Sequence, residues 1–173
     1  ISVSCYSCKD TPVQEWEKHQ FSDDISLELP KDIEVIDDPN FIKRLEVSIS
    51  IKGHNNLFMC LLTTDSSIQF VEGQILRENI KLNIDNFLHS LKATATTEIE
   101  IAQQGKYYLA NFNYKMVMPK EDKAVDIIGI ARFIISEENI AIFLSSHSAH
   151  KFKKITRFNK ANTYFFNNIK LKQ

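Results

Sequence analysis

Two cysteines near the start of the chain, Cys5 and Cys8, have the spacing of a reactive pair. A Cys-x-x-Cys pair acts in disulfide exchange when it lies where a strand meets a helix, because a helix terminus lowers the pKa of a thiol. This pair instead precedes every periodic segment of the sequence. A zinc site needs about four ligands, and no second Cys or His pair stands at zinc-finger spacing. The spacing therefore favours neither redox catalysis nor zinc binding.

The residues in front of Cys5 indicate a lipid anchor. The run Ile1-Ser2-Val3-Ser4-Cys5 resembles the end of a bacterial lipoprotein signal, in which small residues lead to the lipidated Cys. The chain has no initiator Met, as expected if an upstream segment is removed. We predict a lipid on Cys5, a tether over residues 1–20 and a location on the periplasmic side of the bacterial cell envelope. A Cys5–Cys8 disulfide and two incidental thiols are the alternatives.

Two histidines, His147 and His150, would share one side of a helix and could bind a metal. No acidic residue stands near them to complete a ligand set. Serines beside His147 have the types of a nucleophile and its base, but no Gly-x-Ser-x-Gly turn is present. Four scattered glycines cannot form a phosphate-binding loop. We therefore predict no catalytic residue, no metal and no cofactor, and a metal-dependent enzyme is the least favoured interpretation.

The net charge of −1 hides two opposite local charges. Residues 1–40 contain three Lys and ten Asp or Glu, a sum of −7, whereas residues 151–173 contain seven Lys or Arg and no acid, a sum of +7. Near-neutrality overall argues against a nucleic-acid binder, whose affinity comes from many phosphate contacts. The basic segment could bind anionic headgroups or an acidic partner, or could neutralise the acidic segment within the fold. The residues of this candidate basic face are Lys151, Lys153, Lys154, Arg157 and Lys160.

Length and periodicity predict the elements that position these residues. A chain of 173 residues, 43% hydrophobic and 25% charged, fits one globular domain. Four Gly and four Pro against 12 Phe indicate long regular elements, strands especially. We predict a single α+β domain over residues 21–173, with an antiparallel sheet of six to seven strands covered on one face by two helices. Period-two segments are expected at 25–29, 44–52, 57–64, 99–101, 108–118, 125–135 and 140–145, and helical stripes at 73–92 and 150–172.

This order of elements resembles the PsbP-like fold family, which includes the DcrB-like and Mog-like proteins. The resemblance covers roughly residues 21 to 171. The residues behind it are Phe21 with Ile25-Ser26-Leu27-Glu28-Leu29-Pro30, the helix Leu76 to Leu91, the meander Tyr107 to Ser145, and the end of the chain with Phe152 and Phe165-Phe166-Asn167-Asn168-Ile169.

The resemblance implies binding by a sheet face or by loops, without catalysis. Members of the family include photosystem accessory subunits, a small-GTPase-binding protein, bacterial envelope lipoproteins and chaperones of secreted toxins. The expected function is a non-catalytic envelope lipoprotein that binds a protein partner. An immunity protein or effector chaperone of a toxin secretion system is the alternative.

Overall fold

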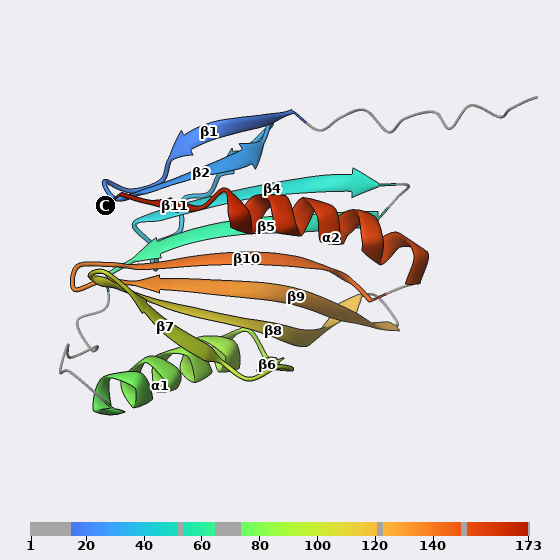
Figure 1. The fold of residues 1–173 in the computed structure, drawn as a ribbon. Helices are drawn as coiled ribbons and strands as arrows, with labels where there is room; N and C mark the ends of the chain where they lie inside the picture. Colours follow the sequence, from blue (N-terminus) through green and yellow to red (C-terminus); the bar gives the residue numbers. More distant parts are fainter. Residues whose placement is uncertain (1–14, 52–53, 65–73, 121–122, 150–151, 173) are drawn as a thin grey trace, which may run out of the picture.

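The computed structural model describes residues 15–51, 54–64, 74–120, 123–149 and 152–172, and Figure 1 shows their arrangement. Every strand pair in these segments is antiparallel. In chain order the elements are β1 (Trp16–Gln20), β2 (Ile25–Pro30), β3 (Glu34–Val35), β4 (Lys43–Ile51), β5 (His54–Thr63), α1 (Gln74–Ser90), β6 (Ala93–Ala95), β7 (Glu100–Gln104), β8 (Tyr107–Lys120), β9 (Lys123–Ile135), β10 (Ile140–Ser148), α2 (Phe152–Asn167) and β11 (Lys170–Leu171).

The strands form a large and a small sheet. The large sheet has eight strands in the order β3-β4-β5-β10-β9-β8-β6, and β7 also pairs with β8. The small sheet has the order β1-β2-β11. It lies beside α2 on one face of the large sheet, and α1 lies on the other face (Figure 1). The molecule therefore has three layers and two hydrophobic cores.

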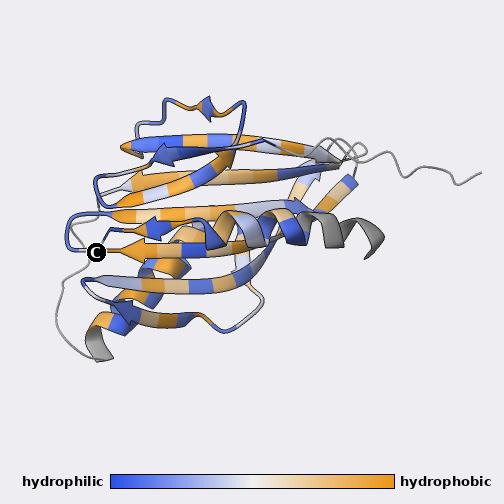
Figure 2. Ribbon diagram, turned by 45° about the horizontal axis from the view of Figure 1, so that its top comes forward, coloured by the Kyte–Doolittle hydropathy of each residue, from blue (hydrophilic) through white to orange (hydrophobic). Residues whose placement is uncertain are grey.

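Strand β10 shows why both faces of the large sheet are buried. Successive side chains of a strand point to opposite faces. Ala141 and Phe143 enter the core under α2 and the small sheet, whereas Ile140, Ile142 and Leu144 enter the core over α1. The strand is apolar without alternation because it is covered on both sides. Figure 2 shows the hydrophobic residues gathered on the central strands.

Helix α1 forms as its periodicity predicts. Leu76, Ile80, Ile84 and Leu88 stand four residues apart and are all buried against the large sheet. Residues at this spacing lie on one side of a helix, so they bury together while the opposite side stays in solvent. The helix is followed by Lys92, whose φ of 53° reverses the chain into β6.

The predicted fold class, α+β with an antiparallel sheet and two helices, is confirmed. Two details differ. The helices lie on opposite faces of the large sheet rather than on one face, because its central strands are apolar on both sides. Residues 16–20, which the sequence assigned to the tether, form β1, because β2 supplies hydrogen-bonding partners along the whole segment. Cys60 on β5 is buried in the core, where it packs as a small hydrophobic residue.

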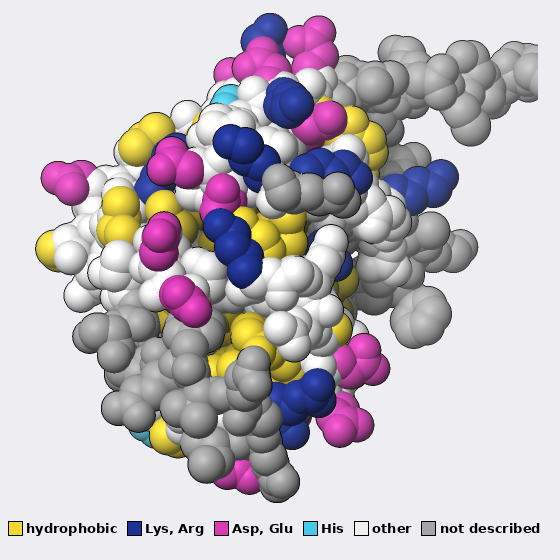
Figure 3. Space-filling view, turned by 60° about the vertical axis from the view of Figure 1, so that its left-hand side comes forward, with side chains coloured by type: hydrophobic (Ala, Val, Ile, Leu, Met, Phe, Trp, Pro, Cys, Tyr) yellow, Lys and Arg dark blue, Asp and Glu magenta, His cyan; other side chains and the backbone are white. Residues whose placement is uncertain are grey.

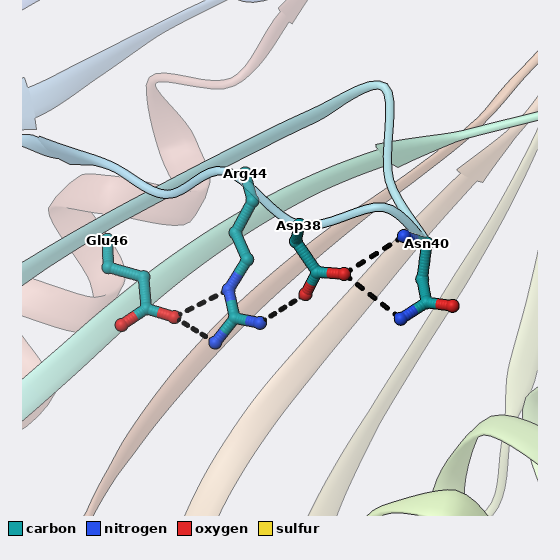
Figure 4. A network of polar contacts seen from close by, with 4 residues as sticks. All are labelled: Asp38, Asn40, Arg44 and Glu46. Atoms are coloured by element: carbon teal, nitrogen blue, oxygen red, sulfur yellow. Dashed lines mark hydrogen bonds and ion pairs between the residues drawn. The ribbon is translucent and has the colours of Figure 1, made fainter.

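A network of polar contacts links the loop between β3 and β4 to strand β4 (Figure 4). Arg44 donates from Nε to the Glu46 carboxylate at 2.8 Å and pairs with Asp38 through Nη1. Asp38 also accepts hydrogen bonds from the backbone and side-chain nitrogens of Asn40, each at 3.0 Å. The Asn40 backbone amide and then Arg44 hold the pKa of Asp38 below its usual value. The network thereby fixes the loop against β4.

Candidate functional site: the outer surface of α2

The outer side of α2 is the candidate site, because it contains the described part of the predicted basic face. The inner side of α2 is buried and includes Asn162, Phe165 and Phe166. Figure 2 shows the described part of the helix with a largely hydrophilic side toward solvent. The residues that line a shallow groove of about 490 Å³ on that side, called the α2 surface below, are Asn159, Lys160, Thr163, Tyr164, Asn167 and Asn168.

A buried polar cluster fastens α2 to the large sheet. The Asn162 side-chain oxygen accepts a hydrogen bond from Nδ2 of Asn56 on β5 at 2.8 Å and another from the hydroxyl of Ser145 on β10. Ser145 also lies 3.3 Å from Oδ1 of Asn56. All three side chains are buried, where an unmade hydrogen bond is costly. The cluster therefore fixes the rotation of α2 about its axis, and with it the residues that face solvent.

Tyr164 is the exposed aromatic residue of the α2 surface, with 42% of its area in solvent. Its ring centroid lies 4.7 Å from that of Trp16, which in turn makes an edge contact with buried Phe58. Its hydroxyl donates to the Glu28 carboxylate on β2. That hydrogen bond raises the pKa of Tyr164. Two strands of the small sheet, β1 and β2, thus hold the ring in one orientation while it remains open to solvent.

The lysines near the α2 surface make no ion pair with a carboxylate of the described residues. Lys160, Lys170 and Lys172 are exposed. Among the described residues, no ion pair joins a carboxylate of segment 15–40 to a cation of segment 159–172. The acidic residues pair elsewhere: Glu15 with Lys31, Asp24 with Lys106, and Asp38 with Arg44. Lys172, which follows α2, lies close enough to Asp24 of the acidic segment to help Lys106 lower the pKa of that carboxyl group.

The other predicted site residues are placed only in part. Lys153, Lys154 and Arg157 belong to the first turns of α2, where the structure does not describe side chains. Lys151, Cys5, Cys8 and His150 lie outside the described residues.

His147 is buried on β10, and burial lowers its pKa. Within the described ranges, no three His, Cys, Asp or Glu residues are arranged to hold a metal ion. None of the described helices combines the length and apolar character that crossing a bilayer would need.

Sequence reasoning missed Trp16 and Tyr164. Trp16 falls in the segment predicted as a tether, and Tyr164 stands on the polar side of the predicted helix. The burial of Asn162, in contrast, could have been predicted from the sequence. This residue occupies the apolar stripe of that helix, where a polar side chain must find a buried partner.

The chain matches no protein-family model, and no curated protein matches its sequence significantly.

Proposed function

We propose that this protein is a non-catalytic, PsbP-like protein of the bacterial cell envelope, which binds an acidic segment of a partner protein through the α2 surface. The observation that carries the proposal is the combination of Lys160 with a fixed, exposed Tyr164 one helical turn away. Tyrosine is prominent among the residues that dominate binding energy at interfaces, and an exposed lysine beside it attracts carboxylates. A ring that is already ordered loses little conformational entropy on binding.

The charge of the segment specifies the chemistry of the partner. Residues 151–173 contain seven cations and no acid, so a partner with carboxylates in excess is attracted and a basic partner is repelled. Asn159, Thr163 and Asn167 supply hydrogen-bonding groups around Lys160. Such a surface suits a polar protein segment better than an apolar one.

The envelope location rests on Cys5 and the small residues before it. We propose that Cys5 is lipidated and that residues 6–14 connect the lipid to β1. Labelled palmitate should be incorporated into the wild-type protein in cells and not into Cys5→Ala. Equal incorporation into both, or none into either, would end the anchor proposal without touching the binding proposal.

Site-specific cross-linking tests the binding proposal. A photoreactive phenylalanine analogue replaces Thr163 on the α2 surface, and a matched variant carries it at exposed Asp85 on α1. Irradiation of cells should give a discrete product from position 163 and not from position 85. Identification of that product also separates an envelope partner from a toxin, the partner expected of an immunity protein or effector chaperone.

Purified components then measure the effect of charge. Lys160→Glu should weaken binding of the identified partner by about tenfold and by less at high salt, since the lost attraction is electrostatic. Lys81→Glu on α1 makes the same charge change on the opposite layer and should leave binding nearly unchanged. Equal effects of the two substitutions, or equal cross-linking from the two positions, would contradict the assignment of the α2 surface.

A further inference from the structure

Strand β4 is the outermost long strand of the large sheet, and its outer edge is only partly covered (Figure 1). On the inner side it pairs with β5 along its whole length, from Lys43 to Ile51. On the outer side the short strand β3 pairs only with Leu45 and Glu46. Among the described residues, no strand pairs with the outer edge of residues 47–51.

The backbone groups left without a described partner on this edge belong to Ser48 and Ser50. Neighbouring residues of a strand direct their backbone N–H and C=O groups to opposite edges. The Arg44 carbonyl accepts a hydrogen bond from the Ile36 amide at 2.9 Å, so the groups of every second residue from Arg44 face outward. The outward groups of Glu46 are taken by β3. The amides and carbonyls of Ser48 and Ser50 therefore remain for a further strand.

The free part of β4 lacks the features that normally protect a sheet edge. Natural edge strands are short, or contain charged residues or proline, which prevent pairing with another chain. Strands β6 and β11 have three and two residues, and β1 contains exposed Glu17 and Lys18. Acidic and basic side chains are also interspersed over the face of the molecule in Figure 3. Residues 47–51 have the sequence Val-Ser-Ile-Ser-Ile, without charge or proline, so nothing in this run opposes pairing.

The alternation of this run suits pairing with an identical strand. Val47 and Ile49 are buried in the core under the small sheet, whereas Ser48 and Ser50 are exposed on the other face. Opposite residues of an antiparallel pair lie on the same face. With a twofold axis at Ile49, each Ser48 lies opposite Ser50 of the second copy, and each Val47 lies opposite Ile51. Apolar residues thus face apolar residues, serine faces serine, and no like charges meet.

We propose that β4 pairs in antiparallel orientation with β4 of a second copy of this chain, so that two large sheets join into one. In this register the free amides and carbonyls of Ser48 and Ser50 all form hydrogen bonds between the copies. A register shifted by one pair would place Ser50 opposite Glu46, whose outward groups β3 already uses. Helix α2 takes no part in the pairing, so the inference stands independently of the α2 surface and its proposed partner.

Sedimentation velocity of the full chain tests for the dimer. The dissociation constant should be on the order of 100 µM, because a single strand pair forms few hydrogen bonds. Ser48→Lys combined with Ser50→Lys should raise this constant at least about tenfold, because lysines then face lysines across the pair. Ala102→Lys combined with Gln104→Lys adds the same charges at exposed positions of β7 and should leave the constant within about twofold.

An exchange of charge tests the register. Ser48→Glu combined with Ser50→Glu should also weaken the dimer at least about tenfold. A mixture of the double-glutamate and double-lysine variants should form a heterodimer at least about tenfold tighter than either variant forms with itself. The reason is that each introduced glutamate then lies opposite an introduced lysine. Restored association also shows that both variants are folded.

Amide hydrogen exchange locates the contact in the wild-type chain. The Ser48 and Ser50 amides should exchange at least about fivefold more slowly at concentrations that favour the dimer than in dilute solution. The Val47 and Ile49 amides face β5 and should be protected in both conditions.

Four results would overturn the proposal. They are a chain that stays monomeric at about 500 µM, equal effects of the β4 and β7 lysines, no heterodimer from the mixed variants, and a dimer in which Ser48 and Ser50 are not protected. The first result would leave the edge to a strand of a different protein.

Discussion

Tyr114 on β8 lies across Gly129 on β9, so closely that a Cβ built on Gly129 would stand 2.5 Å from Cζ of the tyrosine. Gly129 is paired with Tyr114 on one side and with Ser146 of β10 on the other. The tyrosine hydroxyl hydrogen-bonds the side chain of Ser146, so one ring links three strands. Burial raises the pKa of Tyr114 to about 12, and the phenol is therefore neutral under physiological conditions.

Gly129→Ala should lower the free energy of unfolding by about 3 kcal/mol, because the added methyl group overpacks the core. The new Cβ would also stand 2.4 Å from the backbone oxygen of Ser145, which cannot rotate away. Urea denaturation measures the change. Gly105→Asn is the control, since its φ of 59° suits Asn and its surroundings are open. Equal stability of the two variants would contradict the close approach of Tyr114.

Asn162→Ala should lower the free energy of unfolding by about 2 to 3 kcal/mol. The substitution leaves the Asn56 amide and the Ser145 hydroxyl buried without the oxygen that accepts from both. Chemical denaturation measures the loss. Asn159→Ala makes the same change on the exposed side of α2 and should stay within about 0.5 kcal/mol of the wild type. A loss at position 162 no larger than that at 159 would mean that the cluster does not fasten the helix.

The stripe of α1 shows what could be predicted from the sequence. Leu76, Ile80 and Ile84 at intervals of four residues predict a helix and its buried side, and both are confirmed. The stripe does not say which face of a sheet the helix covers, because that depends on strands distant in the sequence. A clue was available in the unbroken apolar run of residues 140–144, which is typical of a strand covered on both faces.

Strand β1 and the α2 surface mark the limit of prediction from sequence. Residues 16–20 have no period-two pattern, and only pairing with β2 makes them a strand. Trp16 contacts Tyr164, which is distant in the sequence, and a local sequence pattern cannot predict such a contact. Lys160 could be predicted as exposed from its helical position, whereas the fixed ring beside it could not. Long-range pairing, rather than local propensity, determines these features.

Asp38→Asn should reduce the sensitivity of the fold to acid. The hydrogen bond from the Asn40 backbone and then Arg44 lower the pKa of Asp38 in the folded state, so its ionised form stabilises the fold above the unfolded value of about 4. That stability is lost as the pH falls through the lower, folded pKa. Denaturation midpoints between pH 5 and about pH 2 should therefore decline less steeply in the variant than in the wild type. Asp37→Asn, at the exposed neighbour, should retain the wild-type slope.

His147 should make the fold less stable as the pH drops below the ordinary histidine range. Its burial lowers the pKa in the folded state, whereas the unfolded chain takes up the proton near the ordinary histidine pKa of 6.5. The unfolded state therefore binds more protons in this range, and stability is present above pH 6.5 and declines as the pH falls through it. Unfolding midpoints measured from pH 8 to about pH 5 should fall for the wild type and change less for His147→Gln. His89→Gln, at the exposed end of α1, should show the same pH dependence as the wild type. If His89→Gln abolishes the pH dependence and His147→Gln does not, His147 is not the source of the pH dependence.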